Sequence, residues 1–142
     1  MRIIALTMFL PTCASAWEFS PHPLCTLSHQ SESAQIEITY DPGVPEYRMT
    51  LNLLAEHWAR SENFGITFRG ERPLTIGTDR HEIDQGNLTV ADTGFGNVLY
   101  GLEFNTIAIA FTSAQTEQFS LAGAPSAVRN FRSCALEDPP TS

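Results

Sequence analysis

Apolar and polar side chains alternate with a period of two along much of this chain, and this alternation restricts the fold more than any other feature. It is clearest over residues 35–40 and 47–53. Strict alternation is typical of strands with one face on a core and one in solvent. Between the two runs, residues 41–45 hold two prolines, which fix φ, and a glycine, which tolerates a tight reversal. Residues 35–53 therefore predict a β-hairpin.

The same pattern predicts further strands in the rest of the chain. Glycine-containing or polar segments separate nearly all of them, as is usual between antiparallel strands. The segment 53–58 is compatible with a helical turn or with a continued strand, and the pattern does not separate the two. The additional strands are expected around residues 64–68, 74–76, 88–90, 107–111 and 119–121.

One stretch near the C-terminus has helical spacing instead. Pro125 stands where a first helical turn tolerates a missing N–H, and Ala127, Val128 and Phe131 follow on one face. Arg129 lies on the other side, toward the end of the helix where a cation is favoured. We therefore expect a mainly β protein, an antiparallel β-sandwich or flattened barrel with one C-terminal α-helix packed on a sheet.

Residues 1–16 have the features of a secretory signal peptide. Arg2 precedes an apolar run that ends before Pro11, and Ala14-Ser15-Ala16 matches the small-residue site that signal peptidase cleaves. Cys13 offers a lipoprotein alternative, but the residues before it match that signal poorly. The sequence thus predicts a periplasmic or secreted protein with a single β-rich domain over 17–136 and a disordered tail over 137–142.

Cleavage after Ala16 leaves two cysteines, Cys25 and Cys134. In an oxidising compartment an even cysteine count favours a disulfide, here one that ties the segment before the first expected strand to the last helix. Two alternatives stay open. A free thiol could act as a nucleophile, or Cys25 could bind a metal together with His22 and His29 in a His-x-x-Cys-x-x-x-His spacing.

The charge of the chain restricts the partners that it is expected to bind. The formal net charge is −8, and the sequence contains no lysine, so no polybasic segment is available to neutralise phosphates. Nucleic acid and anionic membrane surfaces are therefore not expected partners. After the leader, the longest apolar run covers only residues 107–111, which is too short to span a bilayer.

The triplet Asp92-Thr93-Gly94 follows an apolar strand, as in aspartic proteases, where two such loops share a proton between their carboxylates. Only 48 residues follow Gly94 (142 − 94), too few for the flap and second loop that a retroviral-type protease needs. A glycine-rich turn between strands over residues 92–97 is the simpler interpretation.

Residues from Asp79 to Asp84 form a dense polar segment around His81, which could supply a general base or a cation ligand. The spacing does not fit a calcium loop, because Ile83 stands where an oxygen ligand is required. No metal or cofactor is predicted, and no motif of a known catalytic class is present. The residues retained as a candidate functional loop are Asp79, His81, Asp92 and Asn97.

Five short segments, residues 17–20, 25–29, 78–81, 94–102 and 131–134, carry a resemblance to other proteins. Together they resemble a family of small uncharacterised exported proteins of marine and photosynthetic alphaproteobacteria. Some members of that family carry an excinuclease-subunit name, which this acidic chain without a phosphate-binding loop contradicts. Residues 119–127 are also similar to the end of the invasion-associated locus B proteins, which implies a periplasmic β-sandwich without catalysis.

The sequence therefore predicts a non-catalytic binding or accessory domain that recognises a protein or a small ligand through loops at one end. The alternative is a hydrolase that reacts through the Asp92 turn or through the loop from Asp79 to Asp84. An enzyme requires a concave pocket that collects those polar groups, whereas a binding module requires an apolar surface.

Overall fold

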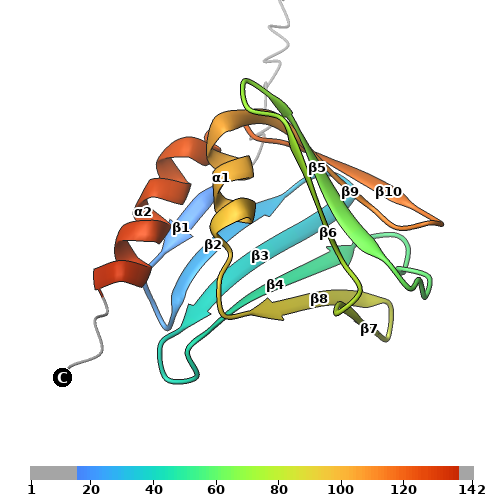
Figure 1. Ribbon diagram of the computed structural model, residues 1–142, viewed down its shortest axis with the longest axis horizontal. Helices are drawn as coiled ribbons and strands as arrows, with labels where there is room; N and C mark the ends of the chain where they lie inside the picture. Colours follow the sequence, from blue (N-terminus) through green and yellow to red (C-terminus); the bar gives the residue numbers. More distant parts are fainter. Residues whose placement is uncertain (1–15, 138–142) are drawn as a thin grey trace, which may run out of the picture.

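Two antiparallel sheets and two helices make up the computed structural model, which describes residues 16–137 (Figure 1). The predicted leader, except Ala16, and the predicted tail after Glu137 lie outside these residues. The first sheet, sheet A, has the order β1 (Glu18–Ser20), β2 (Cys25–Gln30), β3 (Ala34–Asp41), β4 (Glu46–Leu53), β8 (Asn87–Asp92) and β7 (Glu82–Asp84). The second, sheet B, has the order β10 (Thr116–Ser120), β9 (Asn105–Phe111), β5 (Phe64–Gly70) and β6 (Leu74–Thr78). The helices are α1 (Gly96–Phe104) and α2 (Ala124–Glu137).

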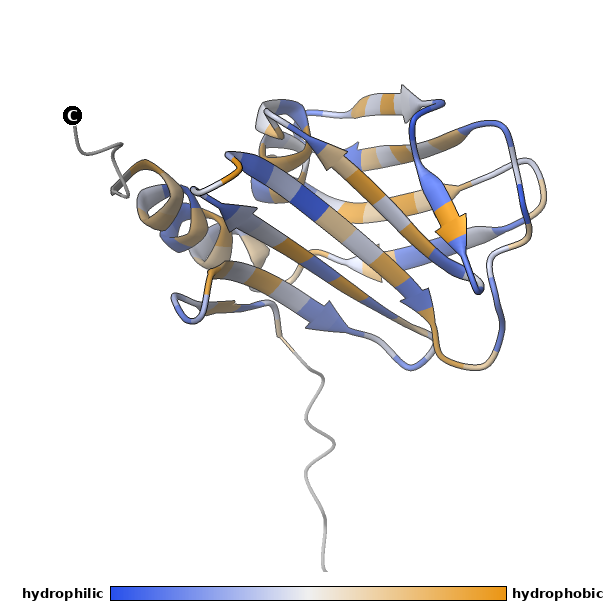
Figure 2. Cartoon of the chain, turned by 90° about the horizontal axis from the view of Figure 1, so that it is seen from below, coloured by the Kyte–Doolittle hydropathy of each residue, from blue (hydrophilic) through white to orange (hydrophobic). Residues whose placement is uncertain are grey.

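The β3–β4 hairpin is confirmed, and it forms the centre of sheet A. Its register pairs Ile36 with Leu51 and Ile38 with Met49, so that these four side chains share the buried face. The Asp41 carboxylate accepts a hydrogen bond from the Gly43 amide at 2.9 Å and closes the turn. Bands of apolar and polar residues alternate along the strands in Figure 2. The mainly β fold follows directly from this alternation.

Strand β9 is also confirmed, but its larger apolar side chains do not face the core. Ala108 and Ala110 are buried, whereas Ile107, Ile109 and Phe111 point outward and stay partly exposed. The reason is volume. Ala108 lies between Phe68 on β5 and Phe119 on β10, both almost fully buried, and a larger side chain there would compete with them for space.

Helix α1 was not predicted, and the expected turn between strands over residues 92–97 leads instead from β8 into this helix. Glycine at its first position and the absence of a side-chain cap at Phe95 make its start weak by local criteria. Tertiary packing stabilises it instead. Leu99 and Leu102 are buried. The side-chain amide of Asn105 donates hydrogen bonds to the backbone carbonyls of Gly101 at 3.0 Å and Arg72 at 2.8 Å.

Helix α2 matches the predicted C-terminal helix and buries the expected face. Val128 and Phe131 are fully buried, and the helix contacts β1 and β2 while lying beside α1 (Figure 1). Arg132 reaches Glu103 of α1 at 3.5 Å. Within residues 16–137, neither helix has both the length and the apolar character needed to cross a lipid bilayer.

A disulfide joins Cys25 to Cys134, as predicted, with Cα atoms 5.9 Å apart. Cys25 is the first residue of β2, not part of a segment ahead of the first strand, because the short strand β1 precedes it in sheet A. The bond links positions 109 residues apart and secures α2 to the sheet that it covers. This bond also takes Cys25 out of the alternative metal site, and His29 stacks on Trp17 at 4.9 Å between ring centroids.

Removal of the disulfide should destabilise the fold. We expect the double variant Cys25→Ala and Cys134→Ala to lose about 2–5 kcal/mol of unfolding free energy, because the unfolded chain regains the freedom of a long loop. Urea unfolding followed by circular dichroism measures the loss. Ser133→Ala, one residue from the bond and exposed, serves as the control and should unfold like the parent. Equal stability of the double variant would contradict a stabilising role for the bond.

Gly101 should tolerate no larger side chain. A Cβ atom there would lie 2.4 Å from the ring of Phe68, which is fully buried and has no room to move. Gly101→Ala should therefore cost about 1–3 kcal/mol of unfolding free energy through overpacking, more than the ~1 kcal/mol that alanine gains in a helix. Gly96→Ala is the matched control, since a Cβ atom added at Gly96 would meet nothing within 4 Å. A Gly101→Ala protein as stable as the Gly96→Ala protein would refute this packing.

Tyr47 makes stability sensitive to high pH. Its ring packs on Tyr40 and Phe95, with centroids 4.6 Å and 5.5 Å away. Burial, reinforced by Tyr40, raises the pKa of Tyr47 above its ordinary value of 10.0, although Arg132 opposes the shift. Above pH 10.0 the unfolded chain therefore releases this proton more readily than the folded chain. The contribution of Tyr47 is complete below that pH and is lost as the pH rises through the folded pKa.

We accordingly expect the unfolding free energy to fall above pH 10.0, and the Tyr47→Phe variant to show a shallower fall. Urea unfolding at a series of pH values tests this. Ser133→Ala, which changes an exposed residue and removes no titratable group, should keep the full slope. Identical slopes for the parent and Tyr47→Phe would contradict the assignment.

Candidate functional site

The chain leaves sheet B at the end of β6 and joins sheet A at the start of β7, and two hollows flank this crossing. One lies between the two sheets and is called here the intersheet cleft. The other lies outside them, around His81, and is called the His81 hollow. The crossing itself consists of residues 79–81, so the polar segment that the sequence singled out stands between two different environments.

The intersheet cleft has a volume of about 420 Å³. Its floor is made of buried side chains from both sheets and from the residue that precedes α1, namely Met49, Phe64, Ile66 and Phe95. Its walls carry Ile76, Val90 and Val98, which belong to the core but stay partly exposed. Ligand pockets in proteins are commonly lined in this way, by apolar side chains with a few polar groups.

Polar groups stand at the rim of this cleft. Asp92 accepts hydrogen bonds from the backbone amide of Thr93 at 2.6 Å and from its hydroxyl at 3.3 Å. Arg80 is exposed, and its guanidinium forms no ion pair within residues 16–137. Asn97, in the first turn of α1, is exposed as well. The rim therefore carries one cation and one anion, and the anion already has local hydrogen-bond donors.

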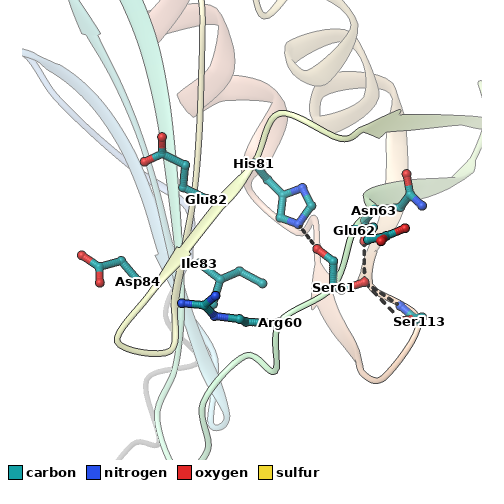
Figure 3. Close-up of a pocket in the computed structure, with 9 residues that line it drawn as sticks. All are labelled: Arg60, Ser61, Glu62, Asn63, His81, Glu82, Ile83, Asp84 and Ser113. Carbon is teal, nitrogen blue, oxygen red and sulfur yellow. Dashed lines mark hydrogen bonds between the residues drawn. The ribbon is translucent and has the colours of Figure 1, made fainter.

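The His81 hollow is more open and more polar, with a volume of about 900 Å³ (Figure 3). His81 points toward Ser61, and its Nε2 lies 2.8 Å from the Ser61 carbonyl oxygen. A carbonyl oxygen only accepts, so Nε2 carries the proton and donates. The other ring nitrogen, Nδ1, is buried and has no hydrogen-bond partner among the described residues.

The His81 hollow does not assemble a nucleophile and a base. The Ser61 hydroxyl donates to the Asn63 carbonyl at 3.0 Å and lies 3.1 Å from the Ser113 hydroxyl, so it contacts neither nitrogen of His81. Glu82 and Asp84 also line this hollow, but their side chains point away from His81 (Figure 3). In the part of the chain that the structure describes, no three His, Cys, Asp or Glu side chains are grouped so that they could hold a metal ion.

The four residues predicted as a functional loop are thus divided between environments. Asp92 and Asn97 line the intersheet cleft, His81 lines the other hollow, and Asp79 is exposed and lines neither. The apolar walls of the cleft, Ile76 and Val90 among them, were not predicted as part of a site. Their alternation predicts that they face inward, but it carries no signal that the space opposite them is only partly filled.

The fold and the cleft define the class to which this chain belongs, an antiparallel β-sandwich with helices across one end and an apolar opening between its sheets. A scan of protein-family models and searches of curated proteins and of solved structures found no match to the chain.

Proposed function

We propose that this protein is an exported, non-catalytic binding domain whose intersheet cleft takes up an apolar group of its ligand. The observation that carries the proposal is the partial exposure of the apolar side chains of Ile76, Val90 and Val98 around a cleft whose floor is buried. Covering apolar surface stabilises a complex by about 25 cal/mol per Å². The cleft volume of about 420 Å³ also lies within the range of small-ligand pockets.

The hydrolase alternative has one feature in its favour, because His81, Glu82 and Asp84 all line the His81 hollow. The hydrogen bonds of that hollow do not support it. His81 Nε2 is occupied by a backbone carbonyl, and the nearest serine hydroxyl is bonded elsewhere. Asp92 is bonded to the residue that follows it and lies across the crossing from the His81 hollow. General acid–base catalysis requires the acting groups to reach the same substrate atoms. Asp92 and His81 line separate hollows, and the side chains of Glu82 and Asp84 point away from His81 (Figure 3).

Export is part of the proposal and has two supports. The Cys25–Cys134 disulfide is of the kind that persists in oxidising compartments. The sequence of residues 1–16 matches a cleavable leader. Mass spectrometry of protein recovered from the periplasm or the medium tests this part, because export predicts a mature chain that begins at Trp17, and an intact Met1 would contradict it.

Filling the cleft should abolish its affinity for apolar molecules. Val90→Trp places a large ring from β8 into the space opposite Ile76, so we expect anilinonaphthalene sulfonate to bind the parent saturably and the variant at least about tenfold more weakly, a loss of about 1.4 kcal/mol. Fluorescence titration of the oxidised protein measures the affinity. Ile109→Trp is the matched control, because Ile109 is similarly half-buried but lies on the outer face of sheet B.

Both variants should retain the parent's circular dichroism spectrum, so that a loss of binding reports on the cleft and not on folding. Equal affinity of the Val90→Trp protein and the parent would show that the dye binds elsewhere. The intersheet cleft would then no longer be the binding site.

A further inference from the structure

Sheet B ends at β6 with an edge that lacks the usual protection against pairing. Proteins shield edge strands by making them short or by placing charges on them. Strand β1 has only three residues and carries Glu18, and β7 has three residues with Glu82 and Asp84. Strand β10 carries Glu117, whose side chain accepts a hydrogen bond from Ser33 in the turn between β2 and β3. The five residues Leu74–Thr78 of β6 include no charge and no proline.

The β6 edge is also regular. It pairs with β5 in continuous antiparallel register from Phe64↔Thr78 to Phe68↔Leu74, without a bulge, and pairs with no other strand among residues 16–137. Leu74, Ile76 and Thr78 face inward and are half-buried. The backbone groups on the free side of the strand therefore remain available to a further strand.

Next to the free edge of β6, the space between the two sheets is also unfilled. Sheet A has six strands and sheet B has four, and α2 covers the β1–β2 end of sheet A. The intersheet cleft opens between β6 of sheet B and β8 of sheet A, where sheet B has no further strand. A strand added to β6 would lie about 4.8 Å from it and would direct every second side chain into the cleft.

We propose that the partner is a short extended peptide segment of another protein, which adds to β6 as a fifth strand of sheet B. Main-chain hydrogen bonds to β6 would supply affinity, and apolar side chains at alternate positions would enter the intersheet cleft. This inference rests on the proposed function, because it names what the cleft receives. Helix α1 contacts β6, and residues 79–81 follow β6 and cross to sheet A. The added strand can therefore pair only along β6 itself, over a length of roughly 17 Å.

The chain offers a substitution that charges this edge. Gly77 lies on β6, and an added Cβ would meet only the Phe64 carbonyl oxygen at 3.8 Å, an ordinary contact. Gly77 also lines the intersheet cleft, but it has no side chain, so only its backbone borders the cleft. Its side-chain direction is outward, away from the cleft, because exposed and half-buried positions alternate along the strand. Gly77→Lys therefore charges the edge without filling the cleft, and Gly77→Ala is its matched control.

The test selects displayed random nonapeptides on the oxidised protein, and the strongest binder is then synthesised. We expect apolar residues at alternate positions of that peptide, binding to the parent and to Gly77→Ala, and loss of binding to Gly77→Lys. N-methylation of alternate backbone nitrogens along one edge of the peptide should also abolish binding. Amide hydrogen exchange of residues 74–78 should slow when the peptide is bound.

Two results would overturn the added strand: no enriched peptide, or enriched peptides that bind Gly77→Lys as well as the parent. A third would overturn the choice of occupant. Self-association of the protein that Gly77→Lys abolishes would identify a second copy of the chain as the occupant. The dye separates this failure from failure of the proposed function. Dye binding that depends on Val90 but peptide binding that ignores Gly77 would refute the added strand alone, whereas dye binding that ignores Val90 would refute the cleft itself.

Discussion

The way helix α1 packs on sheet B depends on the space that its neighbours leave for the ring of Phe68 on β5. The ring is fully buried, with Ala108 paired across from it on β9 and Gly101 of α1 directly against it. Small residues on two neighbours leave room for this large ring, in the usual manner of a close-packed interior. Because α1 is held there, the segment that leads into it from β8 is held at the mouth of the intersheet cleft.

The opening between the sheets follows from their unequal sizes. Helix α2, tied to β2 through Cys25–Cys134, covers one end of the six-stranded sheet, and the four strands of sheet B cover much of the remainder. Neither covers the side where β6 faces β8. Side chains that a complete sandwich would bury, such as Ile76 and Val90, therefore remain partly accessible.

Local patterns predicted the parts of the fold that local forces build. The β3–β4 hairpin depends on alternation and turn residues, and α2 on a 3.6-residue period. Helix α1 has a short, glycine-containing start without a cap, so its stability comes from contacts with β5 and α2 that no local window contains. The candidate site was predicted only in part, since Asp92 and Asn97 do line the cleft, whereas Asp79 and His81 do not.

The mainly β class and the C-terminal helix could be predicted before any fold was known, because periodicity is a property of the chain alone. The pairing of Cys25 with Cys134 was predicted on the assumption of a cleaved leader, and the structure selected it over a free thiol or a metal site. Tertiary packing set which face of β9 is buried, where α1 forms and where the sandwich stays open. These outcomes depend on how side chains from distant segments share volume, as Ala108 does with Phe68 and Phe119. An alternating strand looks the same in sequence whether its inward face meets another sheet or an unfilled cleft.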